Sequence, residues 1–217
     1  MNRYYPIMLN VEECKCVVVG GGSVAARKVE GLLESGAEVV VVSPAISAGL
    51  RDLANVGAIR VIEREYLEQD IDGAQLVFAA TDQRTTNAKI AKDARSRMIP
   101  VNVADAADTG SFIIPSIVRR GGLLLAVSTS GASPALSIRI KKELEQRYGQ
   151  EYESYTKWLG NLRIRINKME IDERKRRELL REALDIPPDS WNNDQDEEAW
   201  ERQIAVLMQR LHGRDCT

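Results

Sequence analysis

The sequence predicts an α/β protein, in which a parallel sheet domain precedes a small α+β unit and a C-terminal helical domain. Three observations support this class. Up to about residue 105, short apolar β-branched runs alternate with helical patterns, which is typical of a parallel sheet covered on both faces. Two apolar runs around Gly121-Gly122 then predict a β-hairpin. From residue 141 on, 15 basic and 17 acidic residues indicate solvent-exposed helices.

The predicted strands of the first domain are short runs rich in valine and isoleucine. They span residues 16–19, 38–42, 59–63, 76–80 and 100–103. A helix is predicted over 23–35, where Gly36 ends it, and a second over 85–97, where alanine and isoleucine recur at helical spacing. This alternation predicts helices that connect parallel strands.

The order of elements changes after the fifth strand. Residues 111–119 and 123–128 form the predicted hairpin, and Pro115 inside its first strand indicates an edge position or a bulge. Ser133 followed by Pro134 predicts the N-cap and first residue of a helix that runs to about Tyr148. Further helices are predicted over residues 152–168, 171–184 and 195–211.

These elements predict three domains: residues 1–113, residues 114–147, and residues 148–217. The middle one has two strands and one helix, which cannot bury two faces without a partner. We therefore expect a homodimer in which two copies of this hairpin unit meet.

The composition excludes several classes of protein. The 217 residues are 44% apolar and 29% charged, with a net charge of −2, so neither nucleic acid nor an anionic membrane is an expected partner. There is no apolar run of about 18 residues to span a bilayer. Cysteines at positions 14, 16 and 216 are too few and too badly spaced for a disulfide framework or a four-ligand zinc site. We expect a cytoplasmic protein without a metal site.

The strongest functional motif follows the first strand directly and opens a helix. Gly20 to Ala25 match G-x-G-x-x-A, the dinucleotide fingerprint of a Rossmann-like domain. Gly20 permits the tight turn, and Gly22 lets the backbone approach a pyrophosphate. Exposed N–H groups of Ser23 and Val24 at the positive helix end attract the phosphates. The alternative is a glycine-rich turn without a ligand.

The second strand ends without the carboxylate that usually binds the adenosine ribose in this fold. Ser43 and Pro44 stand there instead. Ser43 can hydrogen-bond a ribose but cannot repel a 2′-phosphate, and the nearest arginine is Arg51. These residues alone therefore leave NAD and NADP both open.

Polar residues also follow the fourth strand and end the fifth, at the edge where open α/β sheets bind ligands. They are Thr81 and Asp82, which are cofactor-binding candidates, and Asn102 and Asp105. Loop capping is the alternative for the first pair. Asp105 lies at the junction with the hairpin unit, where a cleft is expected.

A candidate anion loop connects the hairpin to the next helix. Its small polar residues are Ser128, Thr129, Ser130 and Gly131. With five basic residues nearby, these predict a pocket for substrate carboxylates. The alternative is a capped helix with a solvated basic face. The only histidine is His212, close to the chain end, so no nucleophilic triad is predicted.

Taken together, these motifs resemble the precorrin-2 dehydrogenase and sirohydrochlorin ferrochelatase family of siroheme biosynthesis, which includes the N-terminal part of siroheme synthase. The resemblance covers about residues 5–145. Its matching blocks are residues 6–7, 17–28, 32–37, 79–82 with Asn87, 102–105, 111–118 and 128–134.

This resemblance implies a homodimeric enzyme that oxidises the tetrapyrrole precorrin-2 to sirohydrochlorin with NAD. NAD would lie on the turn from Gly20 to Val24, beside Ser43 and Pro44. Asp105 would be the acid/base residue or would orient the substrate. Some relatives also insert Fe²⁺ into sirohydrochlorin, and the sequence leaves this open; without a histidine in the expected cleft, we favour a dehydrogenase only. A dinucleotide-sensing module without catalysis is the alternative from another class.

Overall fold

The computed structural model describes residues 4–104, 106, 108–188 and 197–214, with the side chains of 200–211 in the last range. The chain divides into two compact units, Met1–Ile114 and Pro115–Thr217. In the described part of the chain, no helix is both long and apolar enough to cross a membrane. The division into three domains stays a prediction.

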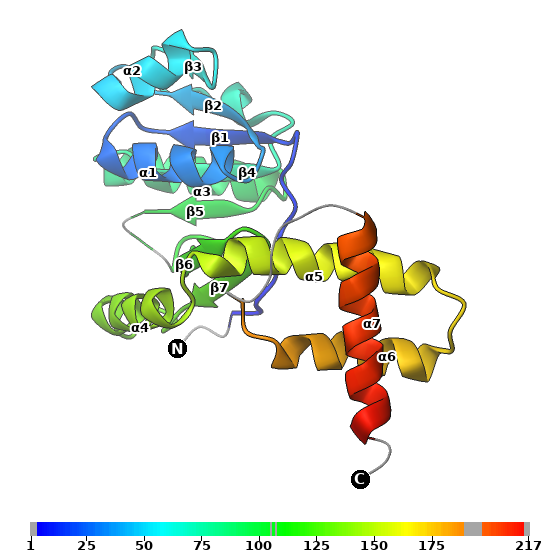
Figure 1. Cartoon of the computed structure of the whole chain (residues 1–217). Helices are drawn as coiled ribbons and strands as arrows, with labels where there is room; N and C mark the ends of the chain where they lie inside the picture. Colours follow the sequence, from blue (N-terminus) through cyan, green and yellow to red (C-terminus); the bar gives the residue numbers. More distant parts are fainter. Residues whose placement is uncertain (1–3, 105, 107, 189–196, 215–217) are drawn as a thin grey trace. The chain divides into compact units, whose positions relative to one another are not determined.

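The first unit is built on a parallel sheet. Among the described residues it has five strands in the order β3-β2-β1-β4-β5 (Figure 1). Their bounds are β1 (Lys15–Val19), β2 (Glu38–Val42), β3 (Arg60–Ile62), β4 (Leu76–Ala79) and β5 (Val101–Val103). All five predicted strands are confirmed to within one residue at each end.

Helices connect these strands. They are α1 (Ser23–Leu33), α2 (Ala48–Asn55), the 3₁₀ helix η1 (Glu68–Ile71) and α3 (Arg84–Ser96). The predictions of α1 and α3 are confirmed. Helix α2 was not predicted, because Leu50 is its only fully buried residue and its eight residues carry little apolar periodicity.

Both faces of the sheet are buried, which explains the nearly continuous valine runs. Helices α1 and α2 cover one face, and α3 covers the other. The first core contains Cys16, Val18, Ala25, Val29, Leu32, Val39, Val41, Leu50 and Phe78. The second contains Val17, Val19, Val77, Ala79, Ile90, Ala91, Ala94, Val101 and Val103. The predicted α/β class with a parallel sheet is confirmed.

The strand order places β1 between β2 and β4, and it pairs with both in parallel. Chain order runs outward from β1 in one direction to β3, and in the other direction to β5. The carboxyl end of β1 is therefore the point where the strand order reverses, which is where open α/β sheets bind ligands.

The second unit begins with an antiparallel hairpin of β6 (Ser116–Arg120) and β7 (Leu123–Val127). The expectation that Pro115 lies inside the first strand is wrong. Pro115 has no N–H to donate to a ladder, and β6 starts immediately after it. Residues 111–114 belong to the first unit, where the Ser111 N–H donates to the Val101 carbonyl at 2.7 Å.

The helices of the second unit follow the hairpin. They are α4 (Pro134–Arg147), α5 (Glu151–Lys168), α6 (Glu173–Glu182) with the 3₁₀ helix η2 (Ala183–Asp185), and α7 (Glu197–Arg214). Ser133 is confirmed as the N-cap of α4, because its hydroxyl accepts from the Leu136 N–H at 3.2 Å. The core of α5, α6 and α7 includes Trp158, Leu162, Leu179, Trp200 and Leu207.

Candidate functional site

The glycine turn after β1 is enclosed by two neighbouring backbone segments. Gly20 has a φ of +127°, and a Cβ added there would lie 2.6 Å from the carbonyl carbon of Ala80, which follows β4. A Cβ on Gly21 would lie 2.9 Å from the carbonyl carbon of Ala45, which follows β2. Both glycines are therefore required by close backbone approach.

Gly22 differs from these two glycines. It is the N-cap of α1 with a φ of −86°, and no described atom lies within 4 Å of the position of an added Cβ. No described side chain caps the helix, and its first turn carries no acidic residue to neutralise the positive end of the helix dipole. Ser23 and Val24 are exposed. The fold thus leaves a space beside uncapped N–H groups, which suits a pyrophosphate.

Ser43, the predicted ribose contact after β2, forms a hydrogen bond within its own loop. The Ser43 hydroxyl is buried and donates to the Ala45 carbonyl at 2.7 Å. The same loop reaches the glycine turn, since the Ser47 N–H donates to the Gly21 carbonyl at 2.8 Å. Ser43 therefore supports the glycine turn through the loop, and Pro44 beside it is exposed.

A charged pair that was not predicted from the sequence lies near this loop. Arg51 of α2 donates both terminal nitrogens to Glu63 at 3.1 and 3.2 Å. Hydrogen bonding and charge from Arg51 hold the pKa of Glu63 below its usual value, so the carboxyl group is ionised at neutral pH. Glu63 follows β3, whose last residue pairs with the last residue of β2. Glu63 and Ser43 therefore both lie at the carboxyl ends of neighbouring strands.

The turn after β4 is held by a buried asparagine. The Asn87 carboxamide oxygen accepts from the Thr81 N–H at 3.1 Å and from the Thr81 hydroxyl at 2.8 Å. The Asn87 amide donates to the Thr81 carbonyl at 3.0 Å. Thr81 is half-buried and Asp82 is exposed. The structure thus brings predicted site residue Thr81 next to Gly20, while Asn87 had no predicted role.

Of the two site residues predicted at the end of β5, the structure describes only Asn102. Asn102 lies within the strand, is buried, and donates its amide to the Phe112 carbonyl at 3.0 Å. This contact fastens residues 111–112 to the sheet. Asp105, the predicted catalytic residue, lies outside the described residues, and the structure tests no role for it.

The predicted anion loop satisfies much of its own hydrogen bonding. Thr129 accepts from the Ser133 N–H at 3.0 Å, and the Ser130 N–H donates to the Ser128 hydroxyl at 3.1 Å. Ser130 and Gly131 have φ values of +52° and +88°. These contacts favour the capped-helix alternative for the loop, and the substrate-binding roles of Asn102 and residues 128–131 stay predictions.

Three of the five basic residues near this loop have partners as well. Arg120 donates to the Tyr148 carbonyl at 3.1 Å. Arg139 pairs with Glu143 at 3.1 Å, and Lys141 with Glu145 at 3.5 Å, both along α4. Such pairs are typical of a solvated helix face.

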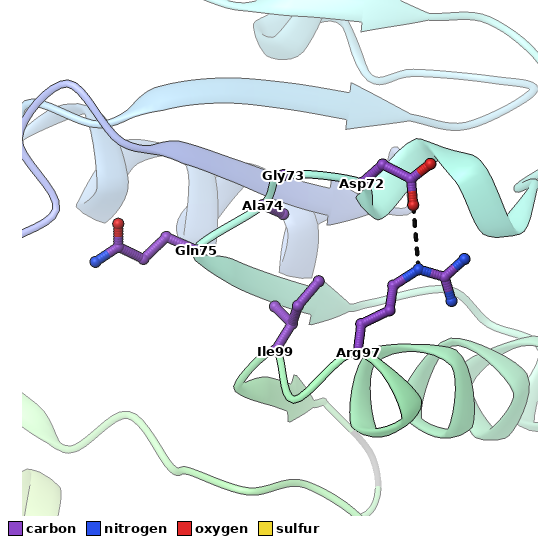
Figure 2. A pocket seen from close by; sticks show the side chains of 6 residues that line it. All are labelled: Asp72, Gly73, Ala74, Gln75, Arg97 and Ile99. Carbon is purple, nitrogen blue, oxygen red and sulfur yellow. Dashed lines mark hydrogen bonds and ion pairs between the residues drawn. The ribbon is translucent and has the colours of Figure 1, made fainter.

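Two other features do not add to the site. A pocket lined by Asp72, Gly73, Ala74, Gln75, Arg97 and Ile99 lies at the amino ends of β4 and β5 (Figure 2). There Arg97 is already paired with Asp72 at 3.1 Å and with Glu68 at 2.8 Å. Within the described ranges, no group of three or more His, Cys, Asp or Glu residues is arranged to hold a metal.

Two family models match the chain. One, described as NAD(P)-binding, covers residues 7–116, and the other, described as the central part of a sirohaem biosynthesis protein, covers residues 120–147. The first model spans the whole of the sheet and the glycine turn. A nicotinamide dinucleotide is thus the cofactor class of this site.

Named relatives agree with these models. A precorrin-2 dehydrogenase from Priestia megaterium is 34% identical over 83% of this chain and 89% of its own length. A siroheme synthase from Methylococcus capsulatus is 38% identical over 85% of this chain but only 39% of its own length. The chain thus spans about two fifths of the siroheme synthases it matches. A solved structure described as SirC, precorrin-2 dehydrogenase, matches with a TM-score of 0.76 and 32% identity over 94% of this chain and all of that chain.

Substitutions of Gly20 and Gly22 should have two different effects. Gly20→Ala forces a Cβ into the Ala80 backbone and strains a positive φ, so it should destabilise the fold by about 2–4 kcal/mol. Gly22→Ala meets no atom of the described residues and should cost less than about 1 kcal/mol of stability. Its Cβ occupies the space that suits a pyrophosphate, so the Kd for NADH should rise about 10-fold or more. Urea unfolding and NADH fluorescence titration measure the two effects. Equal affinity of Gly22→Ala and wild type would contradict the site.

Proposed function

Because this chain belongs to the precorrin-2 dehydrogenase family of siroheme biosynthesis, we propose that it oxidises precorrin-2 to sirohydrochlorin with NAD. The observation that carries the proposal is the open space at Gly22, beside the uncapped N-terminus of α1 and at the switch point of the sheet. A relative of similar length is named for the same reaction. The cytoplasmic location expected from the sequence is part of this proposal.

The reaction removes two hydrogen atoms from the tetrapyrrole. One C–H bond breaks with transfer of a hydride to the nicotinamide ring, and a proton leaves the substrate for a base. The chain's own contribution is to hold the dinucleotide on the backbone of residues 20–24 and to accept the proton. We assign the proton transfer to Asp105, which directly follows Ala104 at the end of β5.

The enzymatic proposal predicts formation of NADH when folded protein is mixed with precorrin-2 and NAD, followed by absorbance at 340 nm. Asp105→Asn should lower kcat by about 100-fold or more, because an amide cannot accept the proton. Its Kd for NADH should stay within about twofold of wild type. Binding of NAD without turnover would support a dinucleotide-sensing module instead, and full activity of Asp105→Asn would remove this residue from the mechanism.

We further propose NAD, rather than NADP, as the cofactor. The 2′-phosphate of NADP would bind at the edge formed by the ends of β2 and β3. There the charge of Arg51 is neutralised by a bidentate ion pair with Glu63, and the ionised Glu63 carboxylate repels a phosphate. In many proteins of this fold a carboxylate at the end of the second strand repels the 2′-phosphate of NADP. Here Glu63, which follows the third strand, has that function.

This preference predicts the effect of Glu63→Gln. Removing the carboxylate charge leaves Arg51 able to pair with a 2′-phosphate, so the Kd for NADPH should fall about 3- to 10-fold, as expected for an exposed charge pair. The Kd for NADH should change less than about twofold. The double variant Arg51→Gln/Glu63→Gln is the matched control and should lose the gain. An unchanged NADPH affinity in Glu63→Gln would refute the assignment.

We also propose that the protein is a homodimer joined through the β6–β7 hairpin. Ile117 of β6 is 37% exposed, and its cross-strand partner is the exposed Ala126 of β7. On the neighbouring helix α4, Leu136 and Ile138 are 44% and 51% exposed. A two-stranded sheet with apolar side chains in water is marginally stable, and a second copy of the hairpin would cover them.

The dimer proposal predicts that Ile117→Glu weakens self-association about 10-fold or more, because a charge would enter an apolar interface. Analytical ultracentrifugation of wild type and variant at micromolar concentration measures this. Lys157→Glu on the exposed face of α5 is the control for a change of surface charge. A monomeric wild type would refute the proposal.

A further inference from the structure

Asn87 makes an unusual set of contacts for a helix residue. It lies in the first turn of α3, is 1% exposed, and both ends of its carboxamide bind Thr81. Its oxygen accepts from the N–H and the hydroxyl of Thr81, and its nitrogen donates to the Thr81 carbonyl. Since β4 has ended at Ala79, the side chain satisfies both backbone groups of Thr81, as a neighbouring strand would.

Thr81 in turn is close to the glycine turn. The Ala80 N–H donates to the Val19 carbonyl at 2.8 Å, so Ala80 continues the pairing with β1. A Cβ on Gly20 would lie 2.6 Å from the Ala80 carbonyl carbon and 3.1 Å from the Thr81 nitrogen. There is no free space between the two segments, so Ala80 and Thr81 form the wall of the glycine turn that lies away from the loop after β2.

The strand order identifies which half of the coenzyme this wall faces. In this fold the adenosine ribose lies at the end of the second strand, and the pyrophosphate lies at the turn after the first. Strand β4 lies on the opposite side of β1 from β2. The turn after β4 therefore lies on the nicotinamide side.

We propose that Asn87 is a positioning residue for the nicotinamide half of the dinucleotide. It does not contact the coenzyme but holds Thr81 and Ala80 in the place that the coenzyme requires. This inference rests on the dinucleotide binding proposed above.

A positioning role and a purely structural role predict different results. If Asn87 only stabilised the fold, its loss would lower stability and leave the affinity of folded protein for every ligand unchanged. If it positions the turn, folded protein should lose affinity for the whole dinucleotide and keep its affinity for ADP, which contains only the adenosine and diphosphate part.

The test compares three variants by NADH fluorescence titration, with ADP measured as a competitor. For Asn87→Ala we expect the Kd for NADH to rise about 10- to 100-fold, since small misplacements of a site have effects of this size. The Kd for ADP should stay within about twofold. Asn87→Asp keeps the two acceptor contacts and loses the donor, so its Kd for NADH should rise less, by about 3- to 10-fold. If Asn87→Ala does not fold, the same comparison is made with Asn87→Asp.

Ile90→Ala is the matched control. Ile90 is fully buried on the same helix, in the core that α3 forms with the sheet, and its apolar side chain cannot hydrogen-bond Thr81. The variant should lose about 2–5 kcal/mol of stability. It should leave the Kd for NADH and for ADP within about twofold of wild type.

Three results would overturn the inference: unchanged NADH affinity of the folded Asn87 variants, an equal loss of NADH and ADP affinity, or the same selective loss in Ile90→Ala. A wild-type protein that does not bind NADH would overturn the coenzyme site itself and this inference with it. Wild-type binding combined with any of the first three results would leave the proposed function intact.

Discussion

The site depends on the close approach of two backbone segments at the centre of the sheet. Strand β1 pairs with β2 on one side and β4 on the other, so the turn after it is confined between the segments that follow both strands. Gly20 and Gly21 have no side chains because the Ala80 and Ala45 carbonyl groups occupy that space. With these two positions fixed, Gly22 and the N-terminus of α1 face an open region. The geometry that favours a phosphate is therefore a result of strand packing.

The polar residues around the glycine turn mainly hold its backbone in place. Ser43 and Ser47 connect the loop after β2 to itself and to Gly21, and Asn87 fixes Thr81 on the other side. Buried polar groups that are fully hydrogen-bonded make a structure rigid, whereas unpaired ones are costly. The site thus presents backbone N–H groups to a ligand while side chains serve as its support. This arrangement suits a coenzyme that brings its own chemistry.

Charge is distributed differently in the two units. In the first, ion pairs such as Arg51–Glu63 and Arg64–Asp70 hold the edge of the sheet and the 3₁₀ helix η1. In the second, pairs four residues apart follow the exposed faces of α4 and α6. The latter contribute little stability individually. The net charge of −2 therefore says little about the ligand, because local pairing decides which charges are available.

The sequence by itself determined the features that local chemistry controls. The valine runs, the glycine fingerprint and the Ser133-Pro134 helix start each depend on neighbouring residues, and the structure has each of them as predicted. The short helix α2 and the start of β6 after Pro115 were not predicted, because one buried leucine gives no clear period and a proline does not show where pairing begins. Only the tertiary structure decided which polar groups meet. Asn87 with Thr81, Arg51 with Glu63 and Asn102 with Phe112 join separate elements, and such partners depend on the packing of strands and helices that no local pattern records.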